Sequence, residues 1–300
     1  VKDNGILPLI KKDSFFSHLK LFLYKRRIEF FIEVSRNRDY LKKIFDQDKN
    51  KFENFSFEDK ENYLHYYGGK LDLTDNRLDP HKGVRIATRK VVPNYTNYFI
   101  SDYNIMDYNL RLYVPFFKRD VFTFNLFRSK ATVTNRGVTD ETELRSILSL
   151  NCETKVEVEA CMRIEDMKVK NQLEENLYGT ATYMGGPNRM RAYDIFRFKG
   201  GNSFYAGMEY RYNFSSNQAP LNWYFIGGLK TIFQVAFFME QGTVANDPKD
   251  LYQNFKPSYG VGFRAIVSGL VYRFDISNGN EGITTTLFFD YPMDIIFLGS

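Results

Sequence analysis

Residues 204–214 alternate between two kinds of side chain. One parity holds Phe204, Ala206, Met208, Tyr210, Tyr212 and Phe214, and the other holds Tyr205, Gly207, Glu209, Arg211 and Asn213. A period of two over this length predicts a β-strand whose two faces meet different surroundings. A tilted strand of this length is also long enough to cross a lipid bilayer.

The same alternation recurs in segments 108–114, 233–240, 259–265 and 270–276. In each segment one parity is aliphatic or aromatic, as a lipid-facing band would be. The other carries glycines and charges, such as Arg111, Arg264 and Asp275, which suits a water-filled lumen. The repetition therefore favours an all-β fold, an antiparallel transmembrane β-barrel, over a soluble sandwich.

Composition agrees with a barrel. The chain has 29 Phe and 21 Tyr but a single Trp, and aromatic girdles at both membrane interfaces would use many of these rings. No uninterrupted apolar run of eighteen residues predicts a transmembrane helix, and no charged and apolar leader opens the chain at Val1. The net charge of +5 is spread out rather than gathered in a basic block, so nucleic acid is not an expected partner.

Eleven strands are predicted, with short and long connections that broadly alternate. The strands cover 18–25, 27–36, 61–75, 83–92, 104–115, 119–132, 203–214, 229–241, 257–267, 269–277 and 283–291. Short turns are expected at Tyr24–Arg27, 75–83, Pro115–Arg119 and Val267–Gly269, and long loops at 37–60, 133–202 and 241–256. The segment 218–228 reads equally well as turn or strand.

Two of the long loops have internal features. The loop 37–60 is rich in charge and predicts a short helix around Tyr40–Phe45. Thr139–Leu150 predicts a capped helical turn with Thr139 or Asp140 as the N-cap. Cys152 and Cys161 lie nine residues apart in the same loop, which favours a local disulfide in an oxidising compartment over two free thiols.

Five motifs, in order along the chain, resemble those of the BamA/TamA-type assembly barrels, also called the bacterial surface antigen family. The resemblance runs from about Asp75 to the C-terminus, and no one motif is specific alone. The motifs are a D-x-R-x-x-P-x-x-G turn at Asp75, Arg77, Pro80 and Gly83; a sixth outer loop with Gly185, Gly186, Arg191, Ala192, Tyr193, Arg197, Phe198 and Gly200; an E-x-R strand end at Glu209 and Arg211; Phe238-Met239-Glu240-Gln241-Gly242; and the strand pair Tyr259 to Asp275. The chain departs from the family at Ala192, where glycine is usual.

In that family the loop-tip arginine folds into the lumen and pairs with an acidic residue of the wall. The resemblance therefore implies that Arg191 pairs with Glu240 first, and with Asp275 second. Parity supports this inference, because Glu240, Asp275, Glu209 and Arg264 all fall on the polar face of their strands. The alternative is that these charges simply line a wet channel.

Alignment to the family's sixteen strands implies that the first four or five strands are absent here. About eleven or twelve of the sixteen lie in this chain, and eleven strands could close only as a smaller, odd-numbered barrel, which bacterial single chains avoid. We therefore expect residues 1–300 to be the C-terminal part of one barrel domain in a longer protein, without the family's POTRA repeats. A barrel completed by another chain is the alternative. The apolar tail 293–300 either continues the last strand or packs on the barrel.

No motif for catalysis or metal binding is found. His18, His65 and His81 have no ligand spacing, and nucleophile elbow, P-loop and H-E-x-x-H patterns are absent from the sequence. We expect no enzyme activity, cofactor or metal.

The resemblance implies a bacterial outer-membrane protein that inserts or translocates other outer-membrane proteins without catalysis. The pinned sixth loop and a seam between the first and last strands would carry this function. Outer-membrane lipids, client proteins and accessory lipoproteins are the implied partners. A passive barrel, acting as an anchor or pore for a fused domain or surface ligand, is the second hypothesis, and a soluble all-β binding protein is the third.

Overall fold

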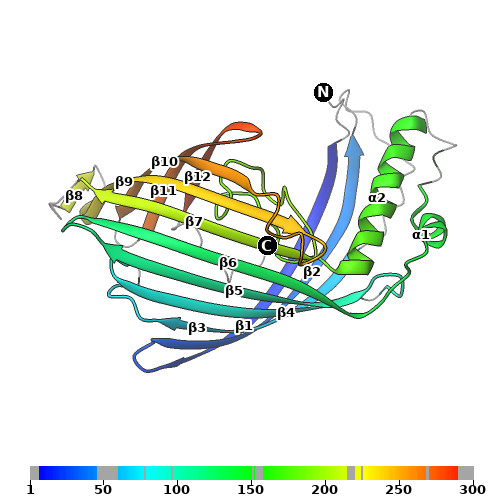
Figure 1. The fold of residues 1–300 in the computed structure, drawn as a ribbon, viewed down its shortest axis with the longest axis horizontal. Helices are drawn as coiled ribbons and strands as arrows, with labels where there is room; N and C mark the ends of the chain where they lie inside the picture. Colours follow the sequence, from blue (N-terminus) through cyan, green and yellow to red (C-terminus); the bar gives the residue numbers. More distant parts are fainter. Residues whose placement is uncertain are drawn as a thin grey trace.

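A single meandering antiparallel sheet organises the chain (Figure 1). The computed structural model describes residues 7–45, 60–77, 79–95, 97–150, 152, 158–214, 220–223, 226–267 and 270–289. The strands are β1 (Leu7–Leu23), β2 (Ile28–Phe45), β3 (Lys60–Asp72), β4 (Gly83–Tyr95), β5 (Asp102–Pro115), β6 (Asp120–Asn135), β7 (Asn202–Asn213), β8 (Pro220–Trp223), β9 (Ile226–Ala245), β10 (Lys256–Val267), β11 (Leu270–Gly279) and β12 (Gly282–Phe289). The predicted all-β antiparallel fold is confirmed.

The strands follow one another in sequence order from β1 to β12, except that β7 pairs directly with β9 and β8 pairs only with β9. The sheet is open: within the described residues no pairing joins β1 to β12. Each of these two strands therefore leaves one edge without a partner strand in the described part of the chain.

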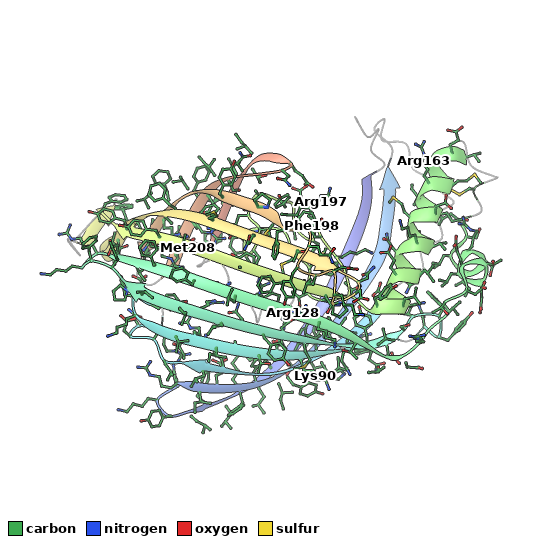
Figure 2. The ribbon with its side chains drawn as sticks, viewed as in Figure 1. Lys90, Arg128, Arg163, Arg197, Phe198 and Met208 are labelled. Carbon is green, nitrogen blue, oxygen red and sulfur yellow. A yellow bond between two sulfur atoms is a disulfide. The ribbon has the colours of Figure 1, made fainter. Side chains whose placement is uncertain are left out.

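The two faces of the sheet differ as the alternation predicts. In β5, Asn109, Arg111 and Tyr113 are buried, whereas Tyr108 and Leu112 are exposed. The same holds along β11, where Arg273 and Asp275 are buried between exposed apolar neighbours. We call the polar, buried side the inner face and the apolar, exposed side the outer face; Met208 of β7 lies on the outer face (Figure 2).

The connections divide the sheet into two rims. The turn rim, at the left of Figure 1, holds the connections β1–β2, β3–β4, β5–β6, β7–β9 and β10–β11. The loop rim, at the right, holds the long β6–β7 connection with helices α1 (Glu141–Leu148) and α2 (Val158–Tyr178). The expected turns at Tyr24–Arg27 and Pro115–Arg119 are present on the turn rim.

The prediction of a short helix at Tyr40–Phe45 is wrong, because β2 continues to Phe45. Its partner is β1, which begins at Leu7 rather than near residue 18, and the register pairs Leu7 with Phe45 and Lys11 with Tyr40. Cross-strand pairing thus overrides the local charge density that suggested a loop. The rest of the predicted loop 37–60, residues 46–59, lies outside the described residues, as do 215–219, 268–269 and the tail 293–300.

Helix α1 was predicted, whereas α2 was not. Asp140 is the N-cap of α1, and its carboxylate accepts a hydrogen bond of 2.9 Å from the backbone N–H of Glu143. Helix α2 exposes Met162, Ile164 and Met167, so its sequence shows no single buried stripe that would mark it as a helix. Neither described helix combines the length and apolar character needed to span a membrane.

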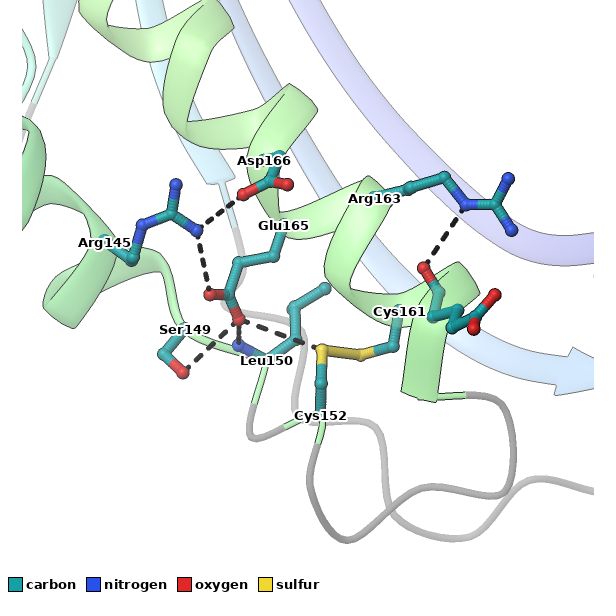
Figure 3. Close-up of a disulfide and its surroundings, with 9 residues drawn as sticks. Arg145, Ser149, Leu150, Cys152, Cys161, Arg163, Glu165 and Asp166 are labelled. Atoms are coloured by element: carbon teal, nitrogen blue, oxygen red, sulfur yellow. Dashed lines mark hydrogen bonds and ion pairs between the residues drawn. A yellow bond between two sulfur atoms is a disulfide. The ribbon is translucent and has the colours of Figure 1, made fainter.

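The two helices form a unit fastened at several points. Leu144 of α1, Val169 of α2 and Phe99 make its small apolar core. A disulfide joins Cys152, in the connection after α1, to Cys161 of α2, and Arg145 of α1 contacts both Glu165 and Asp166 of α2 (Figure 3). A short connection that would otherwise be loosely held is thereby closed by a covalent bond and an ion-pair cluster.

Leu144→Ala should loosen this helical unit. Leu144 is fully buried, and truncating such a leucine costs roughly 2–5 kcal/mol through lost burial and the cavity left behind. We expect faster proteolytic cleavage between residues 136 and 201, measured by mass spectrometry of the fragments. Met167→Ala removes an exposed side chain of α2 and is the control; equal cleavage of both variants would contradict the packing described here.

Candidate functional site

The second half of the β6–β7 connection folds back against the inner face of the sheet. Its two arms form a ladder between Met184 and Phe198, with N–H···O distances of 3.0 and 2.9 Å. Between them the chain turns at residues 190–193, where the Tyr193 N–H donates to the Met190 carbonyl at 3.0 Å. We call residues 190–193 the loop tip.

Glycines and one unusual residue set the course of this loop. Gly185 and Gly186 have φ values of 111° and 104°, which L-residues with side chains rarely adopt, and a Cβ on Gly185 would lie 2.2 Å from the Asp194 carbonyl oxygen. At the tip the left-handed conformation falls on Met190, with φ of 60°. Ala192 is not among the described residues with positive φ, so an alanine at this position carries no backbone strain.

Arg191 is the centre of the site. Its backbone N–H and its Nε donate to the two oxygens of Glu240, both at 2.9 Å. Its Nη1 lies 3.0 Å from Glu209 Oε2 and 3.3 Å from Asp275 Oδ2. All four side chains are almost completely buried, so one guanidinium from the loop joins three carboxylates of the wall, from strands β9, β7 and β11.

Three further arginines of the wall complete the cluster. Arg264 Nη2 lies 2.6 Å from Glu209 Oε2, Arg211 donates to the other oxygen of Glu209, and Arg273 Nε lies 3.1 Å from Asp275 Oδ2. Arg273 also donates to the Pro187 carbonyl of the loop at 2.6 Å. We call these residues the Arg191 cluster: Arg191, Arg211, Arg264, Arg273, Glu209, Glu240 and Asp275.

The electrostatics of Arg191 hold it in its charged form. Burial alone would lower the pKa of its guanidinium, but the carboxylates of Glu240, Glu209 and Asp275 outweigh burial and raise that pKa. The guanidinium carbon also lies 3.3 Å from the centre of the Phe238 ring, a cation–π geometry. Charge-assisted bonds of this kind are directional, so they fix both the position and the orientation of the loop tip.

Neutral contacts anchor the residues on either side of Arg191. The Ser258 hydroxyl accepts from the Ala192 N–H at 3.1 Å and donates to Glu240, and the Ser277 hydroxyl donates to the Arg191 carbonyl at 2.8 Å. The Tyr193 hydroxyl donates to the Pro257 carbonyl at 2.8 Å. The Ala192 methyl group lies 2.9 Å from where a Cβ on Gly279 would stand, so β11 approaches the tip where it has no side chain.

Apolar side chains fill the space between the loop and the wall. Met184, Met190 and Tyr193 of the loop pack with Phe127 of β6 and Tyr205 of β7. The Tyr205 hydroxyl turns toward the charges and donates to Glu240 at 2.9 Å. The loop is thus held by a packed apolar contact as well as by ions.

The turn 75–83 is also ordered by a carboxylate. Asp75 accepts hydrogen bonds from the backbone N–H groups of Asn76, His81 and Lys82 at 2.9–3.0 Å. Burial by itself would raise the pKa of Asp75, but these bonds outweigh it and the pKa is lowered. The His81 ring lies 3.4 Å from the Asn213 side chain of β7. The turn that joins β3 and β4 therefore reaches across the inner face to β7.

The structure brings together Arg191 and the carboxylates inferred from sequence, Glu240, Asp275 and Glu209, with Arg264 beside them. Sequence analysis assigned no role to Ser258 or Ser277 and named Phe238 only as part of the motif around Glu240. Each is buried on the same face as Glu240 or Asp275, so strand parity was the signal that could have found them. Cys152 and Cys161 belong to the helical unit, and among the described residues no group of three His, Cys, Asp or Glu is arranged to hold a metal ion.

An open, curved antiparallel sheet with a long loop bound to its polar inner face defines a protein of the β-barrel class. Among solved structures, the chain is similar to BamA from Haemophilus ducreyi lacking POTRA domains 1–3, with a TM-score of 0.52 and 11% sequence identity. The match covers 94% of this chain and 54% of that chain, so the chain spans about half the length of the BamA structure. At this identity the likeness shows the fold alone. No protein-family model matches the sequence, and no curated protein does.

Glu240→Gln should release the loop tip. Losing one member of a buried ion pair leaves the remaining charges uncompensated and costs about 3–5 kcal/mol. We expect trypsin to cleave after Arg189 and Arg191, which mass spectrometry of the peptides would detect.

Glu281→Gln is the matched control. It breaks the ion pair between Arg197 of the same loop and Glu281 of the β11–β12 turn, where both side chains are well exposed to water and the pair contributes little. Equal protection of Arg191 in both variants would show that the Arg191 cluster does not hold the loop.

Proposed function

We propose that this chain is the C-terminal part of an outer-membrane barrel that inserts or translocates other outer-membrane proteins without catalysis. The observation that carries the proposal is the buried pairing of Arg191 with Glu240, Glu209 and Asp275, in a chain whose fold is similar to that of BamA. The proposed location is the bacterial outer membrane. The proposed partners are its lipids, client barrels and accessory lipoproteins.

The outer face supports a position in the membrane. Leu19, Phe237, Phe263 and Leu287 come from strands along the whole sheet and are each at least half exposed to solvent in the isolated chain. An apolar surface of this extent is unfavourable in water and is covered by lipid in a bilayer. The helical unit would then lie outside the cell, where an oxidising environment maintains the Cys152–Cys161 disulfide.

The open edges support a role in strand addition. β1 is 17 residues long and β12 is 8, and within the described residues each pairs on one side only. A strand edge presents unpaired N–H and C=O groups that can template the pairing of another strand. In the proposed arrangement β1 joins the strands of a longer barrel, and β12 forms one side of the seam at which a client strand is added.

The bound loop fits this role because it stiffens the wall close to the seam. The Arg191 cluster connects β7, β9, β10 and β11, and the Thr284 hydroxyl of β12 donates to the Ala192 carbonyl at 3.3 Å. The last strands are therefore held to the rest of the sheet through the loop as well as through their own ladders. A passive anchor or pore is the competing function, and the following experiment separates the two.

The full-length protein, reconstituted in liposomes, should accelerate the folding of a urea-unfolded eight-stranded client barrel. Folding is measured by the mobility of the unheated client on a denaturing gel, against empty liposomes. A passive barrel would reconstitute equally well and leave the client folding rate unchanged, which would overturn the proposal.

A designed cross-link tests whether the bound loop is needed. Glu240→Gln should slow client folding, and a disulfide between Ala192→Cys and Gly279→Cys should restore the rate in the oxidised protein only. A Cβ at position 279 would lie 2.9 Å from the Ala192 Cβ, closer than the roughly 3.5–4.5 Å of a disulfide, so the loop tip and β11 move slightly apart when the bridge forms. Cys152→Ser and Cys161→Ser remove competing thiols. A rate restored equally under reducing conditions would show that holding the tip is irrelevant.

A further inference from the structure

Two hairpin turns of the turn rim carry the same pattern, aromatic residues followed by basic ones. The β1–β2 turn reads Tyr24-Lys25-Arg26-Arg27, and the β5–β6 turn reads Phe116-Phe117-Lys118-Arg119. Their rings project into solvent: Tyr24 is 81% exposed, Phe116 63% and Phe117 70%. Exposed rings next to exposed cations are unusual at a turn that faces only water.

The two turns lie on the same rim, separated by four steps of the sheet. Neighbouring strands are about 4.8 Å apart, which places the turns about 19 Å from one another along the rim. The other connections there add little negative charge, because residues 214–225 and 268–269 contain no charged side chain. The turn 75–83 contributes Asp75 and Asp79, together with Arg77 and Lys82.

The carboxylates near these turns are used internally. Asp120 is buried and accepts hydrogen bonds from the Phe117 N–H and from the Tyr210 hydroxyl, the latter at 2.8 Å. Asp75 is occupied by three backbone N–H groups, and Asp79 is buried. In the described part of the chain, no carboxylate lies within ion-pair distance of Lys25, Arg26, Lys118 or Arg119. These four exposed cations therefore give the rim a positive charge that the protein itself leaves unbalanced.

Aromatic rings continue from the β5–β6 turn onto the outer face. Phe116 contacts Phe117 and Phe122 with ring centres 4.6 and 5.7 Å apart, and Phe122 contacts Tyr210 of β7 at 4.9 Å. At the other turn the Arg26 guanidinium lies 5.5 Å from the centre of the Phe22 ring. Rings of this kind lie at the boundary between headgroups and acyl chains, which places the cations above them at the depth of the lipid phosphates.

The loop rim differs in its charges. There the exposed basic residues Arg145 and Arg197 are paired with acidic side chains, Asp166 and Glu281. At the two turns, by contrast, the exposed basic residues lie beside exposed rings and have no acidic partner in the described part of the chain.

We propose that the β1–β2 and β5–β6 turns bind the phosphate groups of anionic phospholipids in the leaflet on the turn side. The inference rests on the membrane position proposed above. Each Lys or Arg near an anionic surface increases the attraction by roughly fivefold, so four of them select strongly for such lipids over zwitterionic ones. The selection weakens as salt screens the charges.

The test uses the full-length protein in nanodiscs of phosphatidylcholine with a minor fraction of phosphatidylglycerol. Native mass spectrometry after transfer to detergent measures the ratio of the two lipids that stay bound. We expect a preference for phosphatidylglycerol of at least about fivefold in the wild type. It should fall close to one in the turn variant Lys25→Gln, Arg26→Gln, Lys118→Gln, Arg119→Gln.

A matched variant removes the same four positive charges at the loop rim. Its substitutions are Arg136→Gln, Arg163→Gln, Lys170→Gln and Lys199→Gln. It should keep the wild-type preference.

Equal preferences in all three proteins would overturn the inference and leave the membrane position intact. Failure of the wild type to enter nanodiscs would instead overturn the membrane position, and the lipid site with it. A turn variant that keeps its lipid preference but loses an acidic partner protein would assign the two turns to protein binding and also overturn the inference.

Discussion

The ion cluster around Arg191 is the interaction on which the arrangement of the loop and the last strands depends. Four guanidinium groups and three carboxylates are removed from water there, and such burial is costly unless the charges meet in good geometry. The cost is offset because Glu240 receives both the backbone and the side chain of Arg191, while Glu209 and Asp275 are each shared between arginines. No one strand could supply these partners, so the site exists only when β7, β9, β10, β11 and the loop are assembled.

The inner face explains why this sheet needs a loop at all. Antiparallel strands with one apolar and one polar face have no ordinary hydrophobic core, since the apolar side is directed outward. The apolar packing on the inner side is local and includes Met190 and Tyr193 from the loop. The loop therefore supplies the guanidinium that joins the three carboxylates of the wall and part of the apolar packing between β6 and β11. In the part of the chain that the structure describes, the sheet stays open between β1 and β12, so each of these strands keeps one edge without a partner strand.

Much of the fold and of the site was predictable from sequence because successive side chains of a strand always point to opposite faces of the sheet. Alternation placed Glu209, Glu240, Asp275 and Arg264 on one face, and the family resemblance supplied Arg191 as their partner. The strand extension of β2 to Phe45 was missed because pairing with β1, a contact between distant residues, overrides local charge. Helix α2 was missed because several of its apolar residues are exposed, so its sequence shows no single buried stripe. Ser258, Ser277 and Phe238 have common residue types whose role depends on three-dimensional placement.

The two rims give the sheet a direction that the strands alone do not have. An antiparallel ladder is nearly symmetric end to end, and its dipoles largely cancel. Here one end carries a disulfide-closed helical unit in which Arg145 is paired with Asp166, and the other carries short turns with exposed cations above aromatic rings. The disulfide is stable on either side of a bacterial outer membrane, because the periplasm is oxidising too, so the basic turns alone distinguish the two ends. A sheet that crosses a membrane with these turns at an anionic surface would therefore have one favoured orientation, with the Arg191 cluster held between the two rims.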